Sequence, residues 1–341
     1  MLKALSAAVA LASAIALTGC TPTTNEPNPI VTESVVEKDS LVVYSGRSEE
    51  LIAPLIEIFT AETGIAVEVR YAGSAELAAQ LLEEGSNSPA DVFLAQDAGA
   101  LGAVSNASLF APIPTESLAR VDRIYSDLEG FWVGVSGRAR VLNYNPEKVT
   151  ELPTSVLELA EPQWKGRIAI APTNASFQAF VTAMRVVEGD QTTSEWLAGM
   201  KQNAVIFEKN GAILDAVEAG QVDAGLINHY YWYAKAKELG LENMKSKVTG
   251  FEAEDLGNLV NVAGVGIVQD NTASRAFVEF LLSSKAQTYF AIETSEYPLI
   301  YGIDVIEGLT PLSDVPSPDI DLSDLDSLGQ TLELIRLAGL L

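Results

Sequence analysis

Residues Asn228–Tyr233 bring three phenols, an indole and the only histidine of the chain into six positions, although aromatic residues make up 7% of the sequence. A phenol loses its proton near pH ~10, and the resulting phenolate is a hard, anionic oxygen donor. The run could therefore hold a highly charged cation. It could equally be an aromatic helix face buried in a core, and these six residues alone leave both interpretations open.

The first 19 residues have the pattern of a secretory signal. Lys3 precedes an apolar run that is too short for a permanent membrane helix, which needs ~20 residues. The run ends in Leu17-Thr18-Gly19-Cys20, which resembles a bacterial lipobox. That resemblance implies removal of residues 1–19 and lipidation of Cys20, which would anchor the exported protein to the outer face of the cytoplasmic membrane. The alternative is a buried structural cysteine.

The next segment, residues 20–39, is rich in Thr, Pro, Asn and acidic residues. This composition predicts a flexible tether between the anchor and the folded part of the chain. Because Cys20 is the only cysteine, no disulfide can form within one chain.

The charge of the chain argues against nucleic acid as a partner. The formal net charge is −25, and an acidic surface repels phosphate backbones. An acidic surface also enriches cations locally, although charge alone names no ligand. The apolar content of 48% is enough to fill large cores, and the length suits two lobes.

Strand and helix patterns alternate along the chain. Residues 41–46 form a short β-rich run, and the segment behind it places Leu51, Leu55 and Ile58 at helical spacing. The same alternation continues with a strand over 65–73, a helix over 74–85 and a strand from residue 90. The pattern predicts an α/β fold whose sheet is parallel and covered by helices on both faces.

Two later segments place polar residues where a strand ends and a helix begins. They are residues 167–177, which read RIAIAPTNASF, and residues 221–240, which contain the aromatic run. Ligands of open α/β sheets bind at such edges, because free N–H groups and side chains converge there. We therefore expect the aromatic run to lie at a binding edge of the sheet.

Two long extended segments interrupt the alternation, at residues 131–145 and 258–268. We interpret these segments as crossover strands that join two lobes. The chain would leave the first lobe near Ser136 and return to it near Val262. The predicted first lobe is 40–135 plus 262–305, and the predicted second lobe is 136–261 plus 306–341.

At this point the sequence resembles the ferric-iron-binding periplasmic proteins of ABC transporters, within the wider extracellular solute-binding proteins. The motifs that carry the resemblance run in order over nearly all of the mature chain: VYSGR, PADVFLAQDAGAL, SGRARVLNYN, WKGRIAIAPTNASF, NGAILDAVEAGQVDAGLINHYYWYA and SEYPLIYGI. The resemblance implies a two-lobed periplasmic-binding-protein fold of type II, with two crossovers and a mixed, helix-flanked sheet in each lobe.

The resemblance also implies an iron site. In the family the adjacent tyrosines of the LIN-x-YYW segment are ligands, which fall here on Tyr230 and Tyr231, and one branch adds a crossover-strand tyrosine, which matches Tyr144. Fe(III) is small, hard and highly charged, and phenolates suit it. Because the phenols must lose protons to bind, affinity should fall in acid.

Two departures exclude the mixed ligand set of other family members. Ser48 stands where those members carry a histidine, and Gln96 stands where they carry a glutamate. The three-tyrosine set therefore fits better. His229 is not on the matching strand, and we expect it to have a structural or surface role.

Three phenolates leave open positions on an octahedral ion, for carbonate or water. Arg47 is the candidate partner for an anion, because a guanidinium matches carbonate in a bidentate fork; a solvated surface arginine is the alternative. Asp97 would repel phosphate, or could be a helix N-cap. Further polar residues that match anion-binding positions of the family are Thr173, Asn174, Ser176, Asn210 and Asn228.

The other aromatic residues are expected to be support rather than ligands. Trp232 and Tyr233 follow the pair on the same predicted helix and should pack between helix and sheet. Tyr71 is not expected to be a ligand either. Tyr297 and Tyr301 match a segment close to the family's site, but we expect neither to be a ligand.

The leading hypothesis is a monomeric, lipid-anchored receptor that captures Fe(III) and delivers it to an ABC permease and its ATPase. The alternative keeps the fold and changes the ligand to an oxyanion, an organophosphonate or a polyamine. A secreted enzyme is disfavoured, because the chain has no G-x-S-x-G elbow, no H-E-x-x-H and no cysteine nucleophile.

Overall fold

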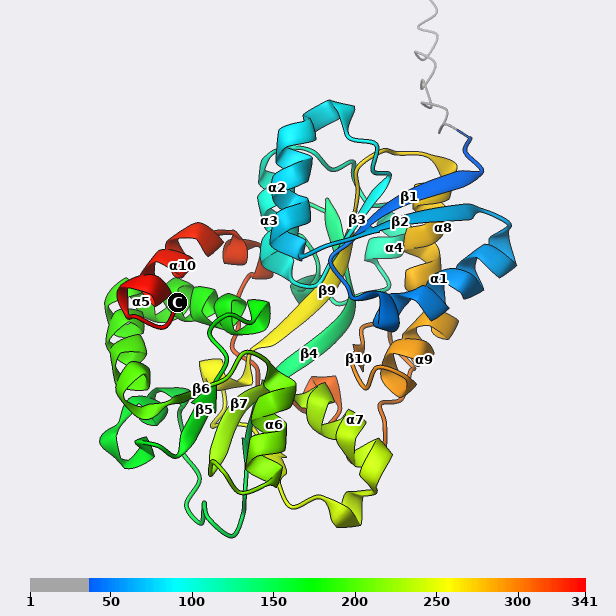
Figure 1. Ribbon diagram of the computed structural model, residues 1–341. Coiled ribbons are helices and arrows are strands. Elements are labelled where there is room, and N and C mark those ends of the chain that lie inside the picture. Colours follow the sequence, from blue (N-terminus) through cyan, green and yellow to red (C-terminus); the bar gives the residue numbers. More distant parts are fainter. Residues whose placement is uncertain (1–36) are drawn as a thin grey trace, which may run out of the picture. The chain divides into compact units, whose positions relative to one another are not determined.

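The computed structural model describes residues 37–341 (Figure 1). The predicted signal peptide, Cys20 and most of the predicted tether lie outside these residues. Among the residues described, no helix is both long and apolar enough to cross a membrane.

The strands of the described residues join into one sheet in the order β2-β1-β3-β9-β4-β7-β5-β6, and β10 and β8 also pair with β4. The strands are β1 Ser40–Ser45, β2 Ala66–Tyr71, β3 Val92–Ala95, β4 Trp132–Tyr144, β5 Ile168–Ile170, β6 Val205–Ile206, β7 Ala224–Asn228, β8 Lys247–Thr249, β9 Val260–Ile267 and β10 Tyr297–Pro298.

Helices pack around this sheet (Figure 1). They are α1 Glu49–Thr63, α2 Ser74–Glu84, α3 Ala98–Asn106, α4 Thr115–Leu118, α5 Ala175–Asn203, α6 Asn210–Glu218, α7 His229–Leu239, α8 Thr272–Leu281, α9 Ser284–Ile292 and α10 Leu328–Leu337. The α/β fold is thus confirmed, with the strands and helices in the predicted order.

Two long strands run through the middle of the molecule, as Figure 1 shows for β4 and β9. Over Trp132–Ala139, β4 pairs with β9, and from Arg140 to Tyr144 it pairs with β7. The change of partner thus falls between Ala139 and Arg140, a few residues past the predicted crossover point at Ser136. The lobe boundaries themselves stay a prediction.

The expectation of a purely parallel sheet is wrong, and the mixed sheet implied by the family is confirmed. The pairs β1–β2, β1–β3, β5–β6 and β5–β7 are parallel, as the βα alternation predicts. The pairs of β4 with β7 and of β9 with β3 and β4 are antiparallel, because the crossover strands return through the sheet.

The local sequence explains why the aromatic run begins a helix. β7, with the sequence AGLIN, is buried along its whole length, which suits a central strand. Gly225 is required there, because a Cβ would come within 2.2 Å of a side-chain carbon of Ile213. Asn228 has extended backbone and takes the N-cap position of α7. The first turn of α7 therefore stands at the carboxyl end of a buried strand.

The C-terminal segment spans both halves of the sheet. The carbonyl of Leu325 lies against Gly99 in α3, while α10 packs on α5. Arg185 in α5 donates to Ser327, Gln330 and Thr331, which fixes the start of α10.

Candidate functional site

Tyr230 and Tyr231 occupy the first turn of α7. Their rings are stacked, with centroids 4.5 Å apart and planes inclined by 27°. Burial and the neighbouring Tyr230 raise the pKa of Tyr231, while the guanidinium groups of Arg138 and Arg140 oppose that rise. The pair therefore presents two adjacent phenols next to positive charge, and a cation that binds them must displace their protons.

His229 is not available as a ligand. Its ring is buried, Nδ1 accepts a hydrogen bond from the amide of Ala139 at 3.1 Å, and Nε2 lies 2.9 Å from the carbonyl oxygen of Ser295. The amide at Nδ1 fixes the neutral tautomer with the proton on Nε2. Burial lowers the pKa of His229 to about 4, which keeps the ring neutral. The expected structural role is confirmed.

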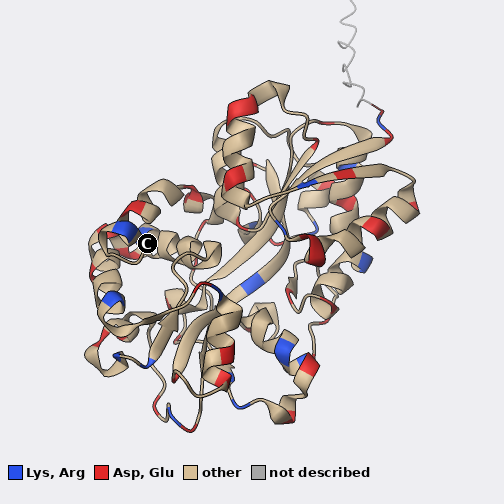
Figure 2. Ribbon diagram, in the orientation of Figure 1, with Lys and Arg blue, Asp and Glu red and all other residues tan. Residues whose placement is uncertain are grey.

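Two arginines that the sequence analysis did not single out face the tyrosine pair. Arg138 and Arg140 lie two residues apart on β4 and so project to the same face of the strand. Both are buried, with 1% and 3% of their surface exposed. Burial lowers the pKa of Arg140 to about 10, against the opposing influence of Tyr230 and Tyr231. In Figure 2, β4 carries blue colour, which marks Lys or Arg, in the middle of the molecule.

Several N–H groups of these arginines have no hydrogen-bond partner among the described residues. They are Nε and Nη2 of Arg140 and Nε and Nη1 of Arg138. In Arg140 the two free groups form one complete edge of the guanidinium, the edge that binds a carboxylate or carbonate through two parallel hydrogen bonds. Buried donors without partners cost about 1–3 kcal/mol each, so their presence favours an anion at this place.

The predicted polar residues gather around the remaining edge of Arg140. Its Nη1 donates to Ser176 Oγ and to Asn228 Oδ1, both at 3.3 Å. Ser176 Oγ also accepts from Asn210 Nδ2 at 3.3 Å and donates to Asn174 Oδ1 at 2.5 Å. These four side chains therefore position Arg140. Thr173 is exposed and donates to the carbonyl of Glu208, so it is not part of this network.

Arg47 is neither a free anion ligand nor a surface arginine, which corrects both expectations. It is 1% exposed and forms a bidentate ion pair with Glu296, with Nη1–Oε1 at 2.8 Å and Nη2–Oε2 at 2.6 Å. A carboxylate from a distant part of the chain already occupies the fork that we assigned to carbonate. The fork of Arg47 is therefore closed to an anion, whereas Arg138 and Arg140 keep N–H groups without a partner among the described residues.

Three candidate residues from the N-terminal part of the chain, Asp97, Gln96 and Ser48, have mainly local structural roles. Asp97 is the N-cap of α3 and accepts from the amide of Ala100 at 3.1 Å, which confirms the N-cap alternative. Burial raises the pKa of Asp97, although Arg138 opposes this. The carbonyl of Gln96 accepts a hydrogen bond from Arg138. Ser48 is the exposed N-cap position of α1, and no side-chain cap bond forms there.

Tyr144 lies at the wrong end of the sheet to join the tyrosine pair. In the register of β4 with β7, Arg140 is opposite Asn228, whereas Tyr144 is opposite Ala224. Four residues of strand separate the two positions, about 13 Å at ~3.3 Å per residue. The assignment of Tyr144 as a third ligand is therefore wrong, because β4 continues past the site before the tyrosine is reached.

Changing Tyr144 to Phe tests this correction. We expect the Tyr144→Phe protein to bind ferric iron with unchanged affinity and an unchanged visible spectrum, because the Tyr144 position lies far along the strand from Tyr230 and Tyr231. Titration monitored by visible absorbance measures both quantities. A shifted band would return Tyr144 to the ligand set.

The remaining aromatic residues support the fold. Trp232 donates from Nε1 to the carbonyl of Ser246 at 3.2 Å, and Tyr233 donates to the carbonyl of Gly308 at 2.8 Å. Tyr71 packs against the main core, and Tyr297 is buried beside the ring of His229, with centroids 4.5 Å apart. These contacts confirm that they are structural.

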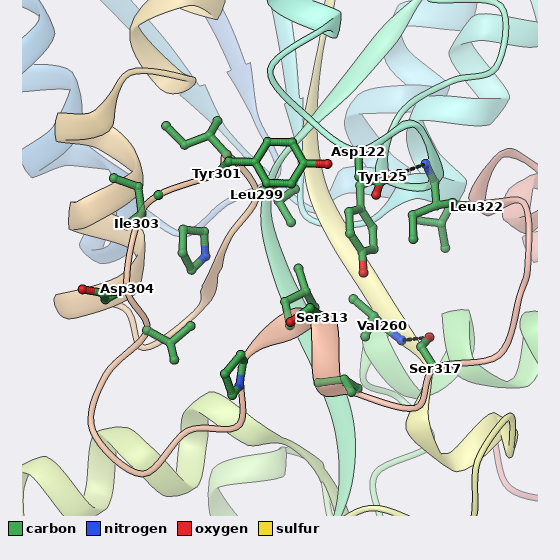
Figure 3. Close-up of a pocket in the computed structure, with 18 of the residues that line it drawn as sticks. Asp122, Tyr125, Val260, Leu299, Tyr301, Ile303, Asp304, Ser313, Ser317 and Leu322 are labelled. Atoms are coloured by element: carbon green, nitrogen blue, oxygen red, sulfur yellow. Dashed lines mark hydrogen bonds between the residues drawn. The ribbon is translucent and has the colours of Figure 1, made fainter.

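Tyr301 is 80% exposed and lines a separate cavity of about 870 Å³. Figure 3 shows Tyr125, Val260 and Tyr301 around this cavity. Val260 is opposite Ala139 in the pairing of β4 with β9, and successive side chains of β4 alternate between faces. The cavity therefore lies on the face of β4 opposite to Arg138 and Arg140, and Tyr301 does not reach the tyrosine pair.

No group of three His, Cys, Asp or Glu side chains that could hold a metal ion occurs within residues 37–341. The hard oxygen donors in the first turn of α7 are the phenols of Tyr230 and Tyr231. The chemistry of this region combines two hard oxygen donors with buried guanidinium groups, which suits a highly charged cation together with an anion.

Comparison with known sequences identifies related proteins. The family model described as "Bacterial extracellular solute-binding protein" matches residues 87–313. The chain is 37% identical to the Fe(3+)-binding periplasmic protein of Serratia marcescens over 88% of this chain and 90% of that protein. It is 34% identical to the major ferric iron-binding protein of Neisseria meningitidis, over 88% and 93% of the two chains.

Solved structures show the same two-lobed architecture. Iron-bound HitA from Pseudomonas aeruginosa superposes with a TM-score of 0.81 at 33% identity, covering 88% of this chain and 99% of that chain. A Trichodesmium protein in complex with iron and citrate superposes with a TM-score of 0.76 at 28% identity, covering 88% and 99%.

Proposed function

Because this chain belongs to the bacterial extracellular solute-binding proteins, we propose that it is the ferric-iron receptor of an ABC importer. The observation that carries the proposal is the stacked Tyr230–Tyr231 pair at the carboxyl end of β7, next to buried arginines. Relatives whose names state ferric iron binding cover nearly the whole chain, which supports the same cargo here.

Tyr230 and Tyr231 supply the protein ligands to iron as phenolates. Two phenolates do not neutralise a trivalent ion, and Arg138 and Arg140 add further positive charge at the same place. Bare Fe(III) would be repelled by these guanidinium groups. The iron therefore binds together with an anion that contacts both the metal and the arginines.

Carbonate or a carboxylate chelator fits the free edge of Arg140. Its Nε and Nη2 groups match two oxygens of a planar anion, and the Nε and Nη1 groups of Arg138 add donors nearby. Water would complete the coordination. The iron and citrate complex of the Trichodesmium relative supports a carboxylate as one form of this anion.

Capture and release follow from the two-lobed fold. Lobes that bend about β4 and β9 would close over the iron and its anion, and the loaded form would dock on the permease. Acid would weaken binding, because protons compete with iron for the phenolates. The lipid anchor at Cys20 would keep the receptor close to the membrane. No catalysis is part of this proposal.

Visible absorbance tests the proposal, since phenolate-to-Fe(III) charge transfer gives an orange to red colour. Apo protein that begins after the tether would be titrated with ferric citrate, with and without bicarbonate. A visible band that saturates at one equivalent supports a tyrosinate iron site. A colourless protein that retains stoichiometric iron contradicts it.

Removing the free edge of Arg140 tests the anion. We expect Arg140→Gln to lower iron affinity about tenfold or more at saturating bicarbonate and to abolish its dependence on bicarbonate, because a charge-assisted bidentate pair is lost. Arg275→Gln, which removes an exposed partner of Asp270, is the matched control and should behave as wild type. Bicarbonate dependence that survives in Arg140→Gln would place the anion elsewhere.

The N–H groups of buried Arg138 and Arg140 that have no partner among the described residues also support a second candidate function, capture of an oxyanion without iron on the same fold. The titration separates the two. Binding of phosphate or carbonate by calorimetry, with no visible band on addition of iron, would favour this alternative.

A further inference from the structure

The contacts of His229 join parts of the molecule that belong to different halves of the sheet. His229 begins α7, directly after β7, whereas Ser295 follows α9 and precedes β10, which pairs with β4 at Ser136 and Gly137. The bond from Nε2 to the carbonyl of Ser295 therefore connects the helix that carries the tyrosine pair to the half of the sheet that contains β1 and β9. The bond at Nδ1 connects the same ring to Ala139, the last β4 residue before the partner change.

The acceptor of this bond is held rigidly. Ser295 has φ 56°, a left-handed conformation that is costly for a residue with a Cβ, about 1–3 kcal/mol. Thr294 Oγ1 lies 2.8 Å from the carbonyl oxygen of Phe290 and 2.9 Å from Glu296 Oε2, so its one hydrogen can bond to either oxygen, and Glu296 is held by Arg47. The segment Thr294–Glu296, here called the Ser295 corner, directs the Ser295 carbonyl toward His229. Its three side chains are buried, which restricts rotation of this carbonyl.

We propose that His229 is a positioning residue: its bond to Ser295 latches the first turn of α7 to the other lobe and thereby slows release of bound iron. The inference rests on the proposed function. Ala139 lies directly at the change of partner, where bending moves it least, so the bond to Ala139 persists when the lobes open and the bond to Ser295 breaks. The ring never touches the metal, so its effect is on the rate of release.

Two conservative variants separate the two bonds of the ring. In His229→Gln, the amide nitrogen takes the place of Nε2 and can donate to Ser295, while the acceptor for Ala139 is lost. In His229→Asn, the amide oxygen takes the place of Nδ1 and can accept from Ala139, but the side chain is too short to reach Ser295. The latch therefore survives only in His229→Gln.

The experiment measures iron release into excess chelator by the decay of the visible band. We expect His229→Asn to release iron about five to ten times faster than wild type, which is the loss of one hydrogen bond of about 1 kcal/mol, while His229→Gln stays within about twofold of wild type. Both should show the wild-type band position at saturation, because the ligands are unchanged. Equal rates in the two variants would overturn the latch.

A readout without iron makes the latch testable separately from the proposed function. In apo protein, amide hydrogen exchange over residues 290–298 should be faster in His229→Asn than in His229→Gln. Absence of a visible band in wild type would refute the iron site, whereas a normal band with equal rates and equal exchange would refute the latch alone.

A third variant keeps the latch testable if both histidine variants fold poorly. Thr294→Val leaves His229 in place and removes the hydroxyl that fixes the Ser295 corner, so it should release iron faster than wild type. Wild-type release in Thr294→Val would count against a rigid acceptor.

Discussion

Replacing Tyr231 with Phe is expected to weaken and shift the visible band at saturation and to weaken ferric iron binding by at least about a hundredfold. The change deletes one of two phenolate donors without altering the volume of the ring, which remains stacked on Tyr230. Affinity would be measured by competition with citrate, and the band by absorbance at saturation. Tyr230→Phe should give a loss of similar size.

Tyr233→Phe is the matched control for this experiment. It removes a phenol two positions further along the same helix, whose hydroxyl donates to the carbonyl of Gly308 instead of facing Arg138 and Arg140. It should keep the wild-type band and affinity. If Tyr231→Phe also kept them, the tyrosine pair would be only an aromatic surface of α7.

Glu296→Ala is expected to destabilise the apo protein by about 3–5 kcal/mol. Arg47 and Glu296 form a bidentate pair whose side chains are 0% and 2% exposed, and removal of one partner leaves a buried charge without compensation. Urea unfolding followed by circular dichroism measures the change. Glu293→Ala breaks a pair with Lys237 in which both side chains are more than half exposed, so it should cost less than about 1 kcal/mol.

The same pair gives stability a pH dependence with a definite sign. Burial raises the pKa of Glu296, but Arg47 outweighs this and holds the pKa below the ordinary value of 4.5. Its contribution to stability is therefore complete above pH 4.5 and is lost as the pH falls through the lower pKa of the folded state. Glu296→Ala should flatten this part of the acid stability curve; equal slopes would exclude the pair as its cause.

The local spacing of apolar residues predicted most of the helices and strands. It did not predict how strands that are distant in the sequence pair in the sheet. Apolar spacing located the βα units because each helix and strand is specified by its own residues. It could not show that β9 inserts between β3 and β4, because that arrangement joins strands more than a hundred residues apart. The expected parallel sheet was wrong for this reason.

In the site, too, the residues that are adjacent in the sequence could be recognised from it, and those whose contacts are distant in the sequence were not predicted correctly. The tyrosine pair was recognisable because both residues lie in one short segment. Tyr144 was misplaced because sequence does not give the register of β4 with β7, and Arg47 was misread because its partner Glu296 lies 249 residues away. Arg138 and Arg140 did leave a signal: two charges at alternate positions of an apolar strand place both on one buried face.

The position of β9 in the sheet governs when the chain can fold. β1, β2 and β3 are made early, but β3 reaches β4 only through β9, and β9 is complete only once residue 267 has been synthesised. A nascent chain therefore holds an unfinished sheet until most of its length exists, and such non-local pairing is slow. For an exported chain that crosses a secretion channel unfolded, this delay would keep the chain in a form that the channel can pass.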